Sequence, residues 1–248
     1  MKYKVAAVSD VGNVRTKNED SILVCRKLFL RKEALLAVVA DGMGGLCHGD
    51  WASRYVTDSL QKWWNAEILP MEQEPSMEAL CDTLGFVIEK LHEGIRMEMQ
   101  KMNTKIGTTL SLVFIYDDEY IIYQVGDSRV YLIDGKAVSQ LTKDQTWCQE
   151  EYDAGRMTRT EMLTHKKRHV LTNAMGIKDE FYSRFLTGQV KHKQRLLLCT
   201  DGYYTYLEEK ELYRKPFQSD VKKVLNQTAD RIRRGKAEDN FSAILIEL

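Results

Sequence analysis

Long apolar runs, paired cysteines and an excess of charge of either sign are all missing from this 248-residue sequence. No apolar stretch reaches the ~18 to 20 residues that span a bilayer, and the apolar part of the opening MKYKVAAVSD is too short for a signal peptide. Because 36 basic residues balance 36 acidic ones, bulk attraction to nucleic acid or to a membrane surface has no support. We therefore expect a cytoplasmic protein that binds neither, and we expect a monomer.

Cysteine, histidine and proline exclude further classes. The five cysteines form no CxxC pair, which is typical of reduced thiols in a cytosolic protein. The five histidines show no HExxH or similar spacing, which argues against a zinc site. Only three prolines occur, and no low-complexity linker or internal repeat separates the chain into parts. We therefore predict a single domain over residues 1–248.

The chain is rich in short β-branched or apolar runs that end in turn residues, a pattern that predicts strands. Two of the connections, IYDDEYII and LIDGKAVSQL, are typical of hairpins, which favours antiparallel pairing. Apolar residues at helical spacing predict helices over 76–102 and 50–64, and a last one over 219–233. These elements predict a layered α+β domain, and two sheets with helices outside would fit. The predicted strands lie in 3–10, 20–26, 34–41, 108–118, 119–127, 129–135, 195–202 and 241–248.

The stretch AVVADGMGG, residues 37–45, places Asp41 at the end of an apolar run and follows it with Gly42. One interpretation is an ordinary tight turn, and the other is a metal site that needs bare backbone beside the acid. In either case we expect the chain to turn sharply after Asp41, before the helix at Asp50.

Similar acids stand at the ends of other apolar strands. Each alone is best explained as a turn former or helix cap, but several half-buried carboxylates repel one another unless a cation binds them. An all-oxygen cluster suits Mg²⁺ or Mn²⁺, and two such ions could activate water and clamp a phosphoryl oxygen. The acids are Asp20, Asp41, Asp127, Asp201 and Asp239.

Arg15 lies four and five residues before Glu19 and Asp20, so one segment could supply both metal and anion contacts. A guanidinium matches the two-pronged geometry of phosphate. Taken alone, Arg15 is better explained as a surface arginine.

Six motifs occur in the order of one known family: SDVGNVRTKNEDS, VVADGMGG, GTTLSLVFI, YQVGDSRVYLI, LLLCTDG and EDNFSAILIEL. From about residue 3 to residue 248 the sequence resembles the metal-dependent Ser/Thr protein phosphatases (the PPM or type-2C family), especially their compact bacterial members. The resemblance implies a four-layer α-β-β-α sandwich, with two central antiparallel sheets flanked by helix pairs.

The resemblance also implies a site. Two ions, Mn²⁺ or Mg²⁺, would be held by Asp41, the Gly42 carbonyl, Asp201 and Asp239, with Asp41 bridging them. Asp20, with Glu19 nearby, would act through metal-bound water or behind the ligands.

Asp127, together with Asp201, matches a third and weaker metal position. Arg15 matches the phosphate-binding arginine, so the implied catalytic residues are Arg15, Asp41 and Asp239.

The implied reaction is hydrolysis of phosphoserine and phosphothreonine by direct attack of a metal-bound hydroxide, without a phosphorylated enzyme intermediate. Its implied partners are phosphorylated proteins, among them a bacterial Ser/Thr kinase and its substrates. Two alternatives stay open: a non-catalytic regulatory or binding module on the same fold, and a hydrolase of small phosphoesters.

The polar segment at about 143–175 corresponds to the flap of such phosphatases, and there we expect Thr164 and His165 near the third metal. A plain surface loop is the alternative for any residue of this segment. Several positions depart from the family pattern and put substrate docking, flap behaviour and the identity of the general acid in doubt: Met43, Cys47, His48, Trp51, Gln145 and Asn173.

Overall fold

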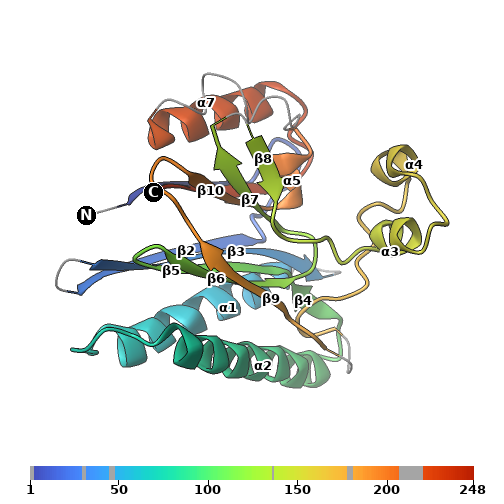
Figure 1. The fold of residues 1–248 in the computed structure, drawn as a ribbon. Helices are drawn as coiled ribbons and strands as arrows, with labels where there is room; N and C mark the ends of the chain where they lie inside the picture. Colours follow the sequence, from blue (N-terminus) through green and yellow to red (C-terminus); the bar gives the residue numbers. More distant parts are fainter. Residues whose placement is uncertain (1–2, 30–31, 45–47, 136, 178–180, 207–219) are drawn as a thin grey trace.

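The computed structural model of the chain describes residues 3–29, 32–44, 48–135, 137–177, 181–206 and 220–248. Two antiparallel sheets lie face to face between helices (Figure 1). The five-stranded sheet has the order β1 (Lys4–Asp10), β11 (Phe241–Glu247), β10 (Arg195–Cys199), β7 (Arg129–Asp134) and β8 (Ala137–Gln140). The main path of the second sheet is β2 (Asp20–Phe29), β3 (Lys32–Gly44), β5 (Leu110–Tyr116), β6 (Glu119–Val125) and β9 (Arg184–Gln189), and its sixth strand, β4 (Ile106–Thr108), pairs with β3.

Helices cover the outer face of each sheet. Under the six-stranded sheet lie α1 (Gly49–Trp63), which continues into a π-helical turn at Trp64–Ile68, and the long α2 (Met77–Met102). Over the five-stranded sheet lies α7 (Val221–Arg234), with the short α5 (Asp201–Tyr204) packed into the same apolar cluster. The four layers confirm the predicted fold class.

Strand β3 shows how the sequence produces this layering. Successive side chains of a strand point to opposite faces of the sheet. Leu36 and Val38 enter the apolar cluster between this sheet and helices α1 and α2, whereas Leu35 and Val39 enter the cluster between the two sheets. Every residue from 34 to 40 is fully buried. A continuous apolar run is therefore what a strand covered on both faces requires, since each buried Leu or Val contributes about 1.5 to 3 kcal/mol.

The helices begin and end close to the predicted positions. Ser76 caps α2 by accepting a hydrogen bond from the backbone of Ala79 at 3.4 Å, and Asn103 ends it in a left-handed conformation. Helix α1 begins at Gly49, one residue before the predicted start, and α7 begins at Val221 after the Asp220 cap. The predicted start at residue 219 lies outside the described residues.

The segment predicted to form a flap, residues 143–175, has secondary structure of its own. Between β8 and β9 the chain forms α3 (Trp147–Asp153) and α4 (Arg159–Thr164), which Figure 1 shows beside the sandwich rather than in either helical layer. Helix α4 opens with a capping box between Thr158 and Glu161. The alternative of a plain surface loop therefore does not hold for these two stretches. No helix among the described residues is long and apolar enough to cross a bilayer.

Candidate metal centre

The chain comes back on itself between Asp41 and α1, as predicted, because Gly49 lies so close to Gly42 that a Cβ atom there would be 2.1 Å from the Gly49 carbonyl oxygen. Residues 45–47 of this connection lie outside the described residues. Asp41 itself lies before the return, inside the strand. Strand β3 continues through Gly44 but changes its pairing partner along the way. Its residues up to Val39 pair with β5, and its residues from Gly42 onward pair with β4. At this change the Asp41 carbonyl accepts hydrogen bonds from the Thr109 amide at 2.9 Å and the Thr108 hydroxyl at 3.0 Å. Asp41 therefore lies where the strand passes from one pairing to the next, ahead of the return to α1.

The structure shows a further reason for glycine at position 42, besides the predicted ligand role of its carbonyl. A Cβ atom at Gly42 would lie 2.1 Å from the carbonyl oxygen of Gly49 and 2.6 Å from that of Glu19. The amide of Gly42 donates to the same Glu19 carbonyl at 3.1 Å. The absence of a side chain therefore lets the start of α1 and the segment before β2 approach the strand that carries Asp41.

The predicted acids meet at one end of the two sheets. Asp20 lies directly opposite Asp41 in the β2–β3 ladder, Asp127 lies between β6 and β7, and Asp201 begins α5 directly after β10. A cleft of about 420 Å³ collects seven of the eight predicted site residues along its wall. They are Arg15, Glu19, Asp41, Gly42, Asp127, Asp201 and Asp239.

The eighth, Asp20, lies buried behind the cleft at 7% exposure. Its Oδ2 accepts a hydrogen bond from the Thr200 hydroxyl at 2.9 Å, whereas its Oδ1 is buried without a hydrogen-bond partner. Burial, and next the charges of Asp201 and Asp239, raise the pKa of Asp20 to about 7. The ionised form is therefore short of a positive partner.

The pKa values of two neighbouring acids, Asp41 and Asp127, are raised as well. Burial raises the pKa of Asp41 well above its usual range, and the charges of Asp20 and Asp201 add to the effect. Burial, with the charge of Asp201 next, likewise raises the pKa of Asp127. Buried carboxylates that repel one another and keep an unpartnered oxygen fit a site for hard divalent cations.

Arg15 and Asp239 contact each other across the mouth of the cleft. The guanidinium makes a two-pronged pair with the carboxylate, with Nη2–Oδ2 and Nε–Oδ1 distances of 2.9 Å each. Both side chains are about half exposed. The predicted phosphate ligand and the predicted metal ligand are thus neighbours.

Two residues that the sequence argument missed build this site. The side chain of Asn240, 5% exposed, donates to the carbonyls of Val11 and Lys17 at 2.9 Å and accepts from the Glu19 amide at 2.8 Å. It therefore holds the segment that carries Arg15. Asn240 stands beside Asp239 in the EDNFSAIL motif, but an uncharged amide was not among the residue types that predicted the site.

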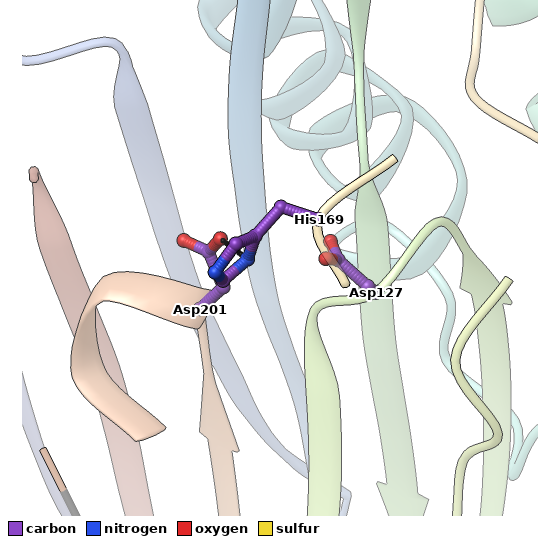
Figure 2. Close-up of side chains that lie close together, drawn as sticks. All are labelled: Asp127, His169 and Asp201. Carbon is purple, nitrogen blue, oxygen red and sulfur yellow. Dashed lines mark ion pairs between the residues drawn. The ribbon is translucent and has the colours of Figure 1, made fainter. Parts of the chain in front are cut away.

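The second is His169. Its Nδ1 lies 3.0 Å from Oδ2 of Asp201 (Figure 2), and one ligand atom from each of His169, Asp201 and Asp127 lies within 4.8 Å of the others. The expectation that His165 approaches this region is wrong: its Nδ1 accepts from the Lys167 amide at 3.1 Å, and its ring packs against Trp147. Both histidines stand in the same polar segment, so the sequence alone gave no signal that His169 rather than His165 would lie beside the acids.

The departures from the family pattern have different consequences. Met43 lines the cleft, where its thioether has no proton to donate. Gln145 and Asn173 are each 2% exposed and bond to each other at 2.9 Å, so they support the flap base rather than dock substrate. His48 immediately precedes α1 and Trp51 stacks on Tyr55, whereas Cys47 lies outside the described residues.

Comparison with known proteins identifies the family. The profile of Protein phosphatase 2C matches residues 14–245. The chain belongs to this family. The phosphatase 2C chain is 30% identical over 218 residues to protein phosphatase PhpP of Streptococcus pneumoniae, covering 84% of this chain and 82% of PhpP.

Solved structures agree with this assignment. The Mycobacterium tuberculosis serine/threonine phosphatase PstP superposes with a TM-score of 0.85 at 26% identity, over 99% of this chain and 98% of that one. A structure of the PstP catalytic domain in complex with two manganese ions gives a TM-score of 0.82 at 25% identity, over 99% and 97% of the chains. The predicted family, fold and protein phosphatase class are therefore confirmed for this phosphatase 2C chain.

Proposed function

We propose that this chain is a metal-dependent protein serine/threonine phosphatase whose reaction takes place in the cleft beside Asp41. The observation that carries the proposal is the meeting of five acids with Arg15 at the same end of the two sheets. A non-catalytic module has no physical need for buried carboxylates that destabilise one another.

The residues fit two core cations. Asp41, the Gly42 carbonyl, Asp201 and Asp239 would hold Mn²⁺ or Mg²⁺, with Asp20 and Glu19 supporting them from behind. The bound ions would supply a nucleophile by lowering the pKa of water and would polarise the phosphoryl oxygens. Manganese in the PstP structure supports the class of ion.

The protein's own groups bind and orient the phosphate. Arg15 offers a planar fork that fits two phosphoryl oxygens, and Asn240 holds its segment in place. The Thr200 hydroxyl fixes one oxygen of Asp20, and Ser53 donates to the Glu19 carbonyl at 2.6 Å. These bonds set the positions of the acids before substrate arrives, which favours electrostatic stabilisation of the developing charge.

The surroundings of the cleft favour a protein substrate over a small phosphoester. A second hollow of about 400 Å³ adjoins the first and shares Arg15, Asp201 and Asp239 with it. Arg168 and Tyr206 extend its lining. Residues on one side of a phosphoserine or phosphothreonine could occupy this space, whereas a small phosphoester would leave it empty.

The biological setting follows from the same proposal. A relative named protein phosphatase in Streptococcus, and relatives named serine/threonine phosphatases in Listeria and Mycobacterium, support phosphoproteins as substrates, with a bacterial Ser/Thr kinase as the opposing enzyme. We also propose a cytoplasmic monomer. The apolar cluster shared by the two sheets supports one domain over residues 1–248.

Phosphate release from a phosphothreonine peptide tests the function. We expect turnover with Mn²⁺ and its loss with EDTA. Asp239→Asn should abolish turnover while leaving the circular dichroism spectrum unchanged, and Asp58→Asn, on the exposed side of α1, is the matched control. Absence of metal-dependent release where another phosphatase 2C enzyme is active would overturn the proposal.

A further inference from the structure

A histidine of the flap stands beside two acids of the sandwich. His169 Nδ1 lies 3.0 Å from Asp201 Oδ2, and one ligand atom from each of Asp127, His169 and Asp201 lies within 4.8 Å of the others (Figure 2). The three come from separate places: the β6–β7 connection, the flap after α4, and the start of α5. Among the described residues, this is the one such group that includes a nitrogen donor.

We propose that His169 is a direct ligand of the third metal, so that the third site of this chain is an Asp127–Asp201–His169 site selective for Mn²⁺ over Mg²⁺. Imidazole nitrogen suits first-row transition metals, whereas Mg²⁺ strongly prefers oxygen ligands. The inference rests on the proposed metal-dependent function, because it adds a residue to that centre.

The charge of the pocket supports a cation. Asp127 is 4% exposed and the side chain of Asp201 is 18% exposed, so two largely buried carboxylates lie in the wall of the same cleft. Arg129, whose charge lowers the pKa of Asp127, is itself engaged, since its Nη2 lies 2.6 Å from Asp144 Oδ2. A divalent ion bound here would balance the charges of the two carboxylates.

The flap backbone holds His169 where a ligand is needed. The amide of Trp147, at the start of α3, donates to the carbonyl of Val170 at 2.8 Å. The Val170 amide in turn donates to the carbonyl of Lys167 at 3.0 Å, closing a turn around His169. The side chain of Lys167 lies over the Trp147 ring, 4.7 Å from its centroid, which directs that cation away from the acids.

A nitrogen ligand has a consequence for the flap. Asp127 and Asp201 belong to the sandwich, whereas His169 belongs to the segment that carries α3 and α4. An ion bound by all three therefore ties the flap to the sandwich. Filling the third site should slow amide hydrogen exchange over residues 146–171, which occupancy of an all-oxygen site formed by the sandwich alone would not do.

Pulsed EPR of the Mn²⁺-loaded protein tests the ligand directly. The predicted core ligands are all oxygens, so coupling of Mn²⁺ to ¹⁴N should appear only with the third equivalent of metal. His169→Asn should remove that coupling and weaken the third Mn²⁺ site, measured by calorimetry, by at least about tenfold. Binding of Mg²⁺ at this site should change much less.

Two further variants make the result decisive. His165→Asn removes the other flap histidine, which packs on Trp147, and should keep the nitrogen coupling. Asp127→Asn should lose both the coupling and the third equivalent although His169 is present. Three equivalents of Mn²⁺ without nitrogen coupling would overturn the inference, and so would coupling that survives His169→Asn. In that case the 3.0 Å contact is a flap-to-sandwich ion pair only.

The inference and the proposed function fail separately. Metal-dependent phosphopeptide turnover without nitrogen coupling would leave the function standing and remove His169 from the site. Nitrogen coupling in a protein that shows no turnover with any loaded metal would support the ligand and overturn the function.

Discussion

The buried carboxylate of Asp20 makes the metal-free protein less stable as the pH rises. Its pKa is raised from an ordinary 3.8 to about 7, first because burial disfavours the charged form. Between these two values the folded state keeps a proton that the unfolded state has released. The unfolded state therefore binds fewer protons, and the free energy of unfolding falls as the pH rises through this window.

The size of the effect follows from the pKa. Near pH 5 to 6 the two states differ by nearly one proton, and by about half a proton at pH 7; a full proton corresponds to about 1.4 kcal/mol per pH unit. Asp20 alone should remove about 3 kcal/mol between pH 5 and pH 8, with little further change above pH 7. The raised pKa of Asp41 acts in the same direction.

Urea unfolding in EDTA at pH 5 and pH 8 measures this loss in the wild type and in Asp20→Asn. The amide still accepts the Thr200 hydrogen bond but does not titrate, so the variant should lose about 3 kcal/mol less than the wild type. The comparison uses the change with pH rather than absolute stability, because the new amide group lies where Oδ1 has no partner.

Asp58→Asn, an exposed change on α1, should behave like the wild type. Saturating Mn²⁺ should reverse the trend, because protons compete less with the metal as the pH rises. Equal pH dependence in the wild type and in Asp20→Asn would refute the argument, as would a metal-free wild type that gains stability toward pH 8.

Three further predictions concern other parts of the site. Gly42→Ala should lower the free energy of unfolding by about 1 to 3 kcal/mol or more and weaken Mn²⁺ binding, since its Cβ would lie 2.1 Å from the Gly49 carbonyl oxygen. An unchanged midpoint of urea unfolding would contradict the close approach. Arg15→Ala should raise KM for phosphopeptide more than it lowers kcat, and wild-type kinetics would remove Arg15 from the site. Gln145→Leu deprives the buried amide of Gly126 of its acceptor at 2.6 Å and should lower the free energy of unfolding by about 1 to 3 kcal/mol, measured with urea. A change below about 0.5 kcal/mol would show that this bond does not hold the start of the flap segment in place.

Local sequence chemistry predicted most of the elements correctly. The apolar runs of β3 and β11 alternate between two buried faces, and the Ser76 cap marks the start of α2. Strand β9 was not predicted, because its side chains are mostly exposed and carry little apolar pattern. The helices of the flap were missed for a related reason, since α4 buries none of its residues.

The sequence by itself determined which residues can form a hard-cation site, because the order and chemical type of the acids are written in the motifs that carry Asp41, Asp127, Asp201 and Asp239. Only the tertiary structure decided what surrounds them. Asn240 holds the Arg15 segment, Gly42 permits the approach of the Glu19 backbone, and His169 rather than His165 faces the acids. These relations join residues far apart in the chain, and no local pattern encodes the distance between two segments that meet only after both sheets have packed.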